Sequence, residues 1–277
     1  MLQHPRLLLF FGLGGWLTAA PAWAGNDNPV LGARAAGLSN AAVTLADVWS
    51  LSNNVAGIGK LEKPELGAYA ENRFMIQGFN SVAFQAVYPT EKYGVGGLDL
   101  YRFGDQLYNE QRLGLGYAHQ IGPVSLGVKA DLLQVRIQGL GSRKTVAFSF
   151  GGHSEVVPDL VVGAHIYNVN QARLADAEDE RVPTVMKAGL SYRPSDKLML
   201  NVETEKQLDL PADFKAGVEY RIIDKLALRT GFSTLAQAAT FGAGFRARHL
   251  EVDFAVGART VLGLSNHLSL SYRFAGL

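Results

Sequence analysis

Short stretches in which apolar and polar residues alternate follow one another from about residue 66 to the end of the chain. In "LMLNVETEK" (198–206), two Leu and one Val take one side while one Asn and two Glu take the other. "FKAGVEYR" (214–221), "LEVDFAVG" (250–257) and "HLSLSYRF" (267–274) repeat the pattern. Because successive side chains of a strand point to opposite faces, this period of two predicts strands between an apolar and a polar medium.

Two architectures are compatible with such strands, a β-sandwich and a transmembrane barrel. The apolar face carries Leu, Val, Phe and Tyr in strand after strand, whereas the opposite face is rich in glycine and full charges. A membrane barrel has this arrangement because its outer face meets lipid and its inner face lines a polar lumen. Beyond the first residues of the chain, no apolar run reaches the length of about 18 residues that indicates a spanning helix. The pattern therefore favours the barrel.

About fourteen alternating segments can be counted, and an even number is typical of bacterial barrels. Every second connection is short, and most of these carry Pro, Gly or Asp, which suit tight turns. The longest connection, residues 168–183, belongs to the other set. The expected fold is all-β, a transmembrane antiparallel β-barrel of about 14 strands. The strands are expected to start near Leu66, Val82, Val95, Arg112, Val124, Thr145, Leu160, Val185, Leu198, Phe214, Leu226, Ala239, Leu250 and His267.

The beginning of the chain has the features of a secretory signal peptide. A positive start is followed by a short apolar run (7–17) and by "AWA" (22–24), a small-x-small cleavage site. We therefore expect a signal peptide at 1–24, a separate N-terminal segment at 25–63 and the barrel at 64–277. Export of such a barrel predicts the outer membrane of a Gram-negative bacterium, with its lipid as a partner. The chain has no cysteine for a disulfide, and its net charge of +1 does not indicate nucleic-acid binding.

The stretch "GARAAGLSNAAVTLADVWSLSNNVAGIG" (32–59) carries a resemblance to a known family. It resembles the start of FadL-type outer-membrane barrels, and it is most similar to their PorV/PorQ relatives. "YAENRF" (69–74) and the "DER-x-P" pattern at 179–183 add to the similarity to PorV/PorQ proteins. The chain departs from the family pattern at Val55, where proline is usual. The matching positions are Ala33, Arg34, Gly37, Asp47, Ser50, Asn54, Ala56 and Gly57.

In that family the segment before the first strand folds into the lumen as a plug, so the resemblance implies a plug here. Small residues would allow its close approach to a glycine-rich wall, and asparagine amides would satisfy backbone groups inside a polar lumen. Trp49 is expected to be a packing residue of this plug. The expected plug motif is Arg34, Gly37, Asp47, Trp49, Asn53, Asn54, Ala56 and Gly57.

The polar face of the expected strands carries many charges of both signs. Mixed signs favour a structural network that fills the lumen over a filter that selects ions of one sign. No histidine lies in a nucleophile motif, and the acidic run 176–180 lacks the spacing of a calcium loop, so we expect no catalytic residue, metal or cofactor. The expected lumen charges include Lys129, Asp131, Glu203, Glu205, Lys215, Glu219, Arg229, Arg246, Glu251, Asp253 and Arg273.

Two functions from different classes remain open. The PorV/PorQ resemblance implies a non-enzymatic interaction or carrier barrel, with proteins of a type IX-like secretion apparatus as partners. The alternative is a FadL-type transporter that takes a hydrophobic ligand through a lateral opening in the wall. Gly94, Gly96 and Gly97 mark the candidate opening, because glycines weaken a strand and often accompany a bulge. Short loops and a lumen expected to be largely charged favour the interaction barrel, since apolar ligands need an apolar lining.

Overall fold

The computed structural model describes residues 29–175, 180–235, 238–260 and 262–275. The expected signal peptide (1–24) lies outside the described residues, as does most of the acidic run 176–180. None of the described helices is long and apolar enough to cross a membrane.

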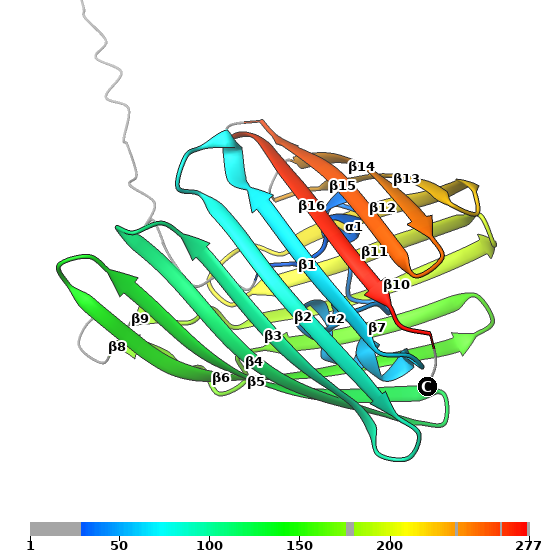
Figure 1. The fold of residues 1–277 in the computed structure, drawn as a ribbon, viewed down its shortest axis with the longest axis horizontal. Helices are drawn as coiled ribbons and strands as arrows, with labels where there is room; N and C mark the ends of the chain where they lie inside the picture. The colour runs from blue at the N-terminus through cyan, green and yellow to red at the C-terminus, as the bar shows by residue number, and fades with distance from the viewer. Residues whose placement is uncertain (1–28, 176–179, 236–237, 261, 276–277) are drawn as a thin grey trace, which may run out of the picture.

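Fourteen antiparallel strands form a closed barrel, in which each strand pairs with its neighbours along the chain and β1 closes the ring on β16 (Figure 1). The expected 14-stranded antiparallel barrel is therefore confirmed. A small two-stranded sheet, β8 (Arg173–Ala175) with β9 (Glu180–Arg181), lies in the connection between β7 and β10. The barrel strands are β1 (Glu65–Asn72), β2 (Asn80–Thr90), β3 (Gly94–Gly104), β4 (Tyr108–Ile121), β5 (Val124–Ile137), β6 (Gly141–Val157), β7 (Leu160–Tyr167), β10 (Val185–Ser195), β11 (Leu198–Gln207), β12 (Asp213–Ile223), β13 (Leu226–Ser233), β14 (Ala238–Ala247), β15 (Leu250–Arg259) and β16 (Gly263–Arg273).

The two ends of the barrel differ. At one end, here called the turn end, strands are joined by two or three residues, such as 91–93 and 122–123, and both β1 and β16 have their free ends there. At the other end, the loop end, lies the long connection that carries β8 and β9, together with the short 3-10 helix η2 (Arg73–Met75). Short turns on the side of both termini are the arrangement of bacterial outer-membrane barrels.

The outer surface is apolar over most of its height. Leu100, Leu113, Leu132 and Val146 lie side by side on β3 to β6 and are each more than 40% exposed, so they form one row of an outward-facing belt. Exposed tyrosines mark the turn end of this belt, at Tyr88, Tyr117, Tyr192, Tyr220 and Tyr272. An apolar belt bordered by aromatic residues is the surface that a barrel presents to lipid.

The belt leads to a prediction on β15. The side chain of Val252 points outward between Phe245 and Leu270 of the neighbouring strands. Val252→Arg is therefore expected to place a charge in lipid one outward step from Tyr272 at the border of the belt. It should lower the free energy of unfolding by about 1–3 kcal/mol, since the cost falls from about 2–4 kcal/mol at the midplane toward the interface. Urea titration of the protein in lipid vesicles measures this, with Val252→Leu as the matched control. Equal stability of the two variants would show that this strand faces the other way.

The described residues before β1, from 29 onward, lie inside the barrel (Figure 1). They contain α1 (Ala33–Gly37), α2 (Ser50–Asn53) and the 3-10 helix η1 (Val55–Lys60). Here residues 29–63 are called the inner segment. Its α1 contacts β13 to β16, whereas η1 contacts β3 to β6 on a different arc of the wall. Leu31, Val48, Leu51, Val55 and Ile58 are all fully buried, so burial of apolar side chains stabilises the position of this segment.

Candidate functional site

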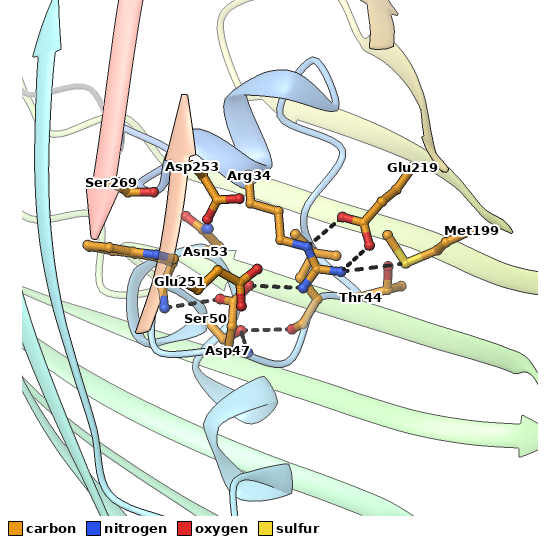
Figure 2. Close-up of polar contacts among 12 residues, drawn as sticks. Arg34, Thr44, Asp47, Ser50, Asn53, Met199, Glu219, Glu251, Asp253 and Ser269 are labelled. Atoms are coloured by element: carbon orange, nitrogen blue, oxygen red, sulfur yellow. Dashed lines mark hydrogen bonds and ion pairs between the residues drawn. The ribbon is translucent and has the colours of Figure 1, made fainter. Parts of the chain in front are cut away.

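The functional candidate is the interface between the inner segment and the barrel wall, and its most connected residue is Arg34. Arg34 lies on α1 and donates hydrogen bonds to both carboxylate oxygens of Glu219, at 2.8 and 3.0 Å (Figure 2). Glu219 also accepts from Nε of Arg229 at 2.7 Å, and Arg229 in turn pairs with Asp253 at 2.5 Å. Arg34 also lies 3.4 Å from Asp47 of the inner segment. This Arg34 cluster joins the inner segment to β12, β13 and β15.

The charges of the inner segment depend on these contacts. Burial raises the pKa of the Asp47 carboxyl above its usual range, although the neighbouring Arg34 opposes that shift. Burial also disfavours the charge on Arg34, but Glu219 and then Asp47 outweigh it and hold the pKa of the guanidinium above its usual range. Asp47 has a local role as well, because it accepts a hydrogen bond from the backbone N–H of Trp49 at 3.0 Å.

A second group of buried charges surrounds Ser52 of α2. Lys129 lies 2.7 Å from Asp99 and 2.9 Å from Asp131, and Arg112 lies 3.0 Å from Asp99. The hydroxyl of Ser52 donates to Asp99 at 3.0 Å, so it ties the inner segment to this group. Lys129 and Asp131 were predicted from the sequence as lumen charges, whereas Asp99 and Arg112 were not. The signal available for Asp99 was the alternation of β3, where it shares the inward face with Gly97 and Tyr101.

In a third contact between the wall and the inner segment, a carboxylate of the wall binds backbone N–H groups of the segment. Glu203 on β11 accepts hydrogen bonds from the N–H groups of Ala42 and Val43, each at 2.8 Å. Lys215 lies 3.7 Å from Glu203 and 2.6 Å from Glu205. These lysine and glutamate side chains therefore serve both a wall network and the inner segment, which supports a structural role for the mixed charges.

The remaining predicted charges lie near the turn end. Arg246 and Glu251 pair at 2.6 Å, and Arg273 pairs with Glu65 at 2.5 Å. The side chains of Arg246 and Arg273 are 41% and 48% exposed, so these pairs are only partly shielded from solvent.

The predicted asparagines hold the inner segment in its folded shape. The amide of Asn53 exchanges two hydrogen bonds with the backbone of Leu31, both at 2.9 Å. Asn54 donates to the carbonyls of Val43 at 2.7 Å and Gly152 at 3.0 Å, so it links two turns of the segment to β6. Its Oδ1 also accepts from the N–H of Ala56 at 3.3 Å. Backbone groups that would otherwise be buried without partners are thereby satisfied.

Glycines on the inner wall face the inner segment at contact distance. A Cβ atom on Gly97 would lie 2.8 Å from Leu51, and one on Gly116 would lie 2.4 Å from the same side chain. A Cβ on Gly67 would meet the ring of Trp49 at 2.8 Å, and one on Gly127 would meet the backbone of Ala56 at 2.7 Å. Because such distances are too short for a real Cβ, these wall positions require glycine for the segment to fit. Further wall examples are Gly163 against Val43, and Gly217 and Gly231 against Leu38. Two glycines of the segment itself also pack closely: a Cβ on Gly37 would lie 3.2 Å from Gly242 of the wall, and Gly57 packs within the segment against Leu45 and Ser50.

The lumen is not uniformly charged. Along β1 to β4 the inward-facing side chains include Tyr69, Val87, Val95 and Tyr101, all at most 7% exposed, and they pack in one cluster with Trp49 of the inner segment. The expectation of a largely charged lumen is therefore wrong for this arc. Among the charges on these strands, Asp99 of β3 pairs with Arg112 of β4 and with Lys129 of β5. The apolar side chains of the arc are therefore left to meet the apolar face of the inner segment.

The outer face of β1 to β4 carries a groove at the turn end of the barrel. The groove has a volume of about 570 Å³. It forms because Ala86 and Gly96 have small or no side chains between larger outward-facing neighbours. A Cβ atom on Gly96 would meet nothing within 4 Å. Here this hollow is called the outer groove. Its lining includes Pro64, Leu66, Ala86, Tyr88, Gly96, Gly97, Leu98, Leu115 and Phe274.

The wall itself is unbroken at the glycines that were expected to mark a bulge. The pairing of β3 with β2 and with β4 runs without a register shift through Gly94, Gly96 and Gly97. The expected bulge is therefore absent. Gly97 lies in a regular ladder with Leu51 of the inner segment packed against it, and Gly96 lies in the same ladder facing outward into open space. Glycine at position 94 is explained differently. Gly94 is the first residue of β3 after the turn, and its φ of +81° favours glycine. The lateral opening stays a prediction.

Within the described ranges, no group of three or more His, Asp or Glu residues could hold a metal ion. No protein-family model matches the chain, and no curated protein matches its sequence.

Solved structures do resemble it. A Pseudomonas aeruginosa FadL homologue gives a TM-score of 0.68 at 12% identity, covering 91% of this chain and 100% of its own. CymD, a monoaromatic hydrocarbon channel, gives 0.66 at 14% identity, covering 88% and 97%. The toluene transporter TodX of P. putida gives 0.66 at 12% identity, covering 91% and 100%. The chain therefore shares the fold of FadL-type barrels, whereas closeness to PorV/PorQ proteins is not shown and a role in secretion gains no support.

Proposed function

We propose that this protein is an outer-membrane channel for hydrophobic small molecules, which pass between the lumen and the membrane through the wall at Gly97. The observation that carries the proposal is the thinness of the wall there. Gly97 and Gly116 are paired across β3 and β4, so neither contributes a side chain on the inner face. Leu51 of the inner segment lies directly behind them, and the outer groove lies in front of Gly97. Only backbone separates the apolar side chain of Leu51 from the lipid-facing hollow.

The two sides of this wall suit an apolar ligand. Inside, Leu51 belongs to the apolar cluster that also contains Trp49, Tyr69 and Tyr101. Outside, the lining of the groove is mostly aliphatic and aromatic, and its volume falls within the usual range for small-molecule sites. The inner segment would then act as a plug that fills the lumen at rest, and displacement of Leu51 from Gly97 and Gly116 would connect the two apolar regions. CymD, a monoaromatic hydrocarbon channel, and TodX, a toluene transporter, share this fold and support a ligand of this class.

Filling the outer groove tests the route. Gly96→Phe is expected to lower the uptake of radiolabelled toluene by cells about tenfold, the effect of roughly 1.4 kcal/mol, because the new ring would occupy the groove between Tyr88 and Tyr117. The variant should fold, since Gly96 points outward into open space. The matched control is Gly152→Phe, an outward glycine on β6 whose added Cβ would meet only Leu126 at 3.9 Å.

Uptake that is unchanged by Gly96→Phe, or reduced equally by Gly152→Phe, would contradict a route through this wall. Mass spectrometry of the purified protein adds a second arm. A retained apolar ligand is expected, whereas a stoichiometric protein companion without any such ligand would favour the interaction barrel instead.

A further inference from the structure

A polar row crosses the outer surface at the loop end of β3 to β6. The pairing of the strands places Arg102 beside Gln111, Gln111 beside Gln134, and Gln134 beside Lys144. One step further along, Arg136 lies opposite Ser142. The cationic row is defined here as Arg102, Gln111, Gln134, Arg136, Ser142 and Lys144. Adjacent strands are about 4.8 Å apart, so the four strands present these side chains over roughly 14 Å.

The height of the cationic row is set by the apolar belt. On each of the four strands, one polar residue lies two positions beyond a residue of the apolar row, toward the loop end. The polar residues are Arg102, Gln111, Gln134 and Lys144, and the apolar ones are Leu100, Leu113, Leu132 and Val146. Two residues of a strand advance about 6.6 Å, so the polar atoms begin within one side-chain length of the lipid-facing surface. The strands β4, β5 and β6 are also the longest of the barrel, with 14, 14 and 17 residues, and in Figure 1 these green strands reach far from the C-terminus.

Within the described ranges, no carboxylate pairs with the cations of this row. The row itself contains no Asp or Glu. Glu110 is only 8% exposed and accepts from the hydroxyl of Tyr108 at 2.7 Å. Asp105 accepts from the backbone N–H groups of Leu107 and Tyr108 in its own loop. Among the contacts of the described residues, no ion pair involves Arg102, Arg136 or Lys144.

We propose that the cationic row binds the phosphate groups of a phosphorylated glycolipid in the outer leaflet. Arginine and lysine are the side chains that bind phosphate, and the neighbouring glutamines and serine can donate further hydrogen bonds. The partner is a membrane lipid and not a free anion, because its acyl chains would lie along the leucine row directly beneath the cations. The inference concerns the outer surface and does not depend on what passes through the lumen.

The test uses native mass spectrometry of the intact protein in detergent, titrated with bisphosphorylated lipid A. The triple variant Arg102→Gln, Arg136→Gln and Lys144→Gln is expected to bind this lipid roughly a hundredfold more weakly, which is about fivefold for each cation removed. All three side chains are exposed, so the variant should fold, and circular dichroism verifies that it does. The matched control replaces three exposed lysines at the turn end, Lys92→Gln, Lys197→Gln and Lys225→Gln, and should keep the full affinity.

Two comparisons separate the chemistry of the ligand. Lipid A from which the phosphates have been removed should bind the original protein as weakly as the triple variant binds the phosphorylated form. Inorganic phosphate at the same concentration should not displace the lipid, because it lacks the acyl chains. Equal affinity for dephosphorylated lipid A, displacement by inorganic phosphate, or an equal loss in the turn-end control would each overturn the proposal.

Discussion

Deletion of residues 25–60 is expected to convert a nearly silent protein into one with large, steady openings in a planar bilayer, with a current roughly tenfold or more above that of the intact chain. The physical reason is that the inner segment packs against strands on different arcs of the wall, from β13–β16 to β3–β6. A 14-stranded barrel without it would enclose a water-filled lumen lined by the charges of Lys129, Glu203, Glu219 and Arg229.

Adding back a synthetic peptide of residues 29–60 is the control for this experiment. Its contacts with the wall are specific, through Arg34 to Glu219 and through the backbone of Ala42 and Val43 to Glu203, so it should lower the current again. A peptide of the same composition in scrambled order should not. High conductance from the intact protein would show that the inner segment does not close the lumen.

Glu219→Leu is expected to lower the free energy of unfolding by about 3–5 kcal/mol, the effect of leaving buried charges without their partner. Glu219 is only 3% exposed and is shared by two guanidinium groups, those of Arg34 and Arg229. Its removal leaves these two cations facing each other at the point where α1 meets the wall. The variant should also release the inner segment, so that trypsin cuts near Arg34 faster than in the original protein and the bilayer current rises.

Two further variants show whether the effect belongs to the buried pair. The double variant Arg34→Met with Glu219→Leu should recover part of the lost stability, because it removes one of the two unpaired cations. Glu251→Gln changes a 2.6 Å pair with the more exposed Arg246 and only a long contact of 3.9 Å with Arg229, so it should cost no more than about 1 kcal/mol. If Glu219→Leu and Glu251→Gln were equally mild, the Arg34 cluster would not be what holds the segment.

The sequence by itself determined the barrel. Alternation with a period of two depends only on which residues are apolar, and the outer face of each strand must be apolar because it meets lipid. The spacing of short turns then predicted where strands begin, and the structure has a strand at each predicted place, for example β5 at Val124 and β15 at Leu250. The inward direction of Lys129, Glu203 and Asp253 followed from the same alternation.

The contacts inside the barrel were decided by the tertiary structure. Arg34 and Glu219 are 185 residues apart, and their meeting requires both closure of the ring and the register of β12 against its neighbours. The apolar arc of β1 to β4 was missed because small and aromatic residues such as Ala83, Val95 and Tyr101 do not stand out on the inward face of a strand. It becomes visible only when the inner segment presents Leu51 and Trp49 to it.

The glycines of β3 show most clearly which properties the sequence determines and which depend on the tertiary structure. From the sequence, Gly96 and Gly97 were expected to interrupt a strand, since glycine has no side chain to pack and its backbone is permissive. In the folded protein both lie in a regular ladder, and their roles differ by the face on which they lie. Gly97 makes room for Leu51 inside, and Gly96 forms part of the outer groove. A sequence determines which side of a strand a residue occupies, but what lies beyond that side depends on segments that only folding brings together.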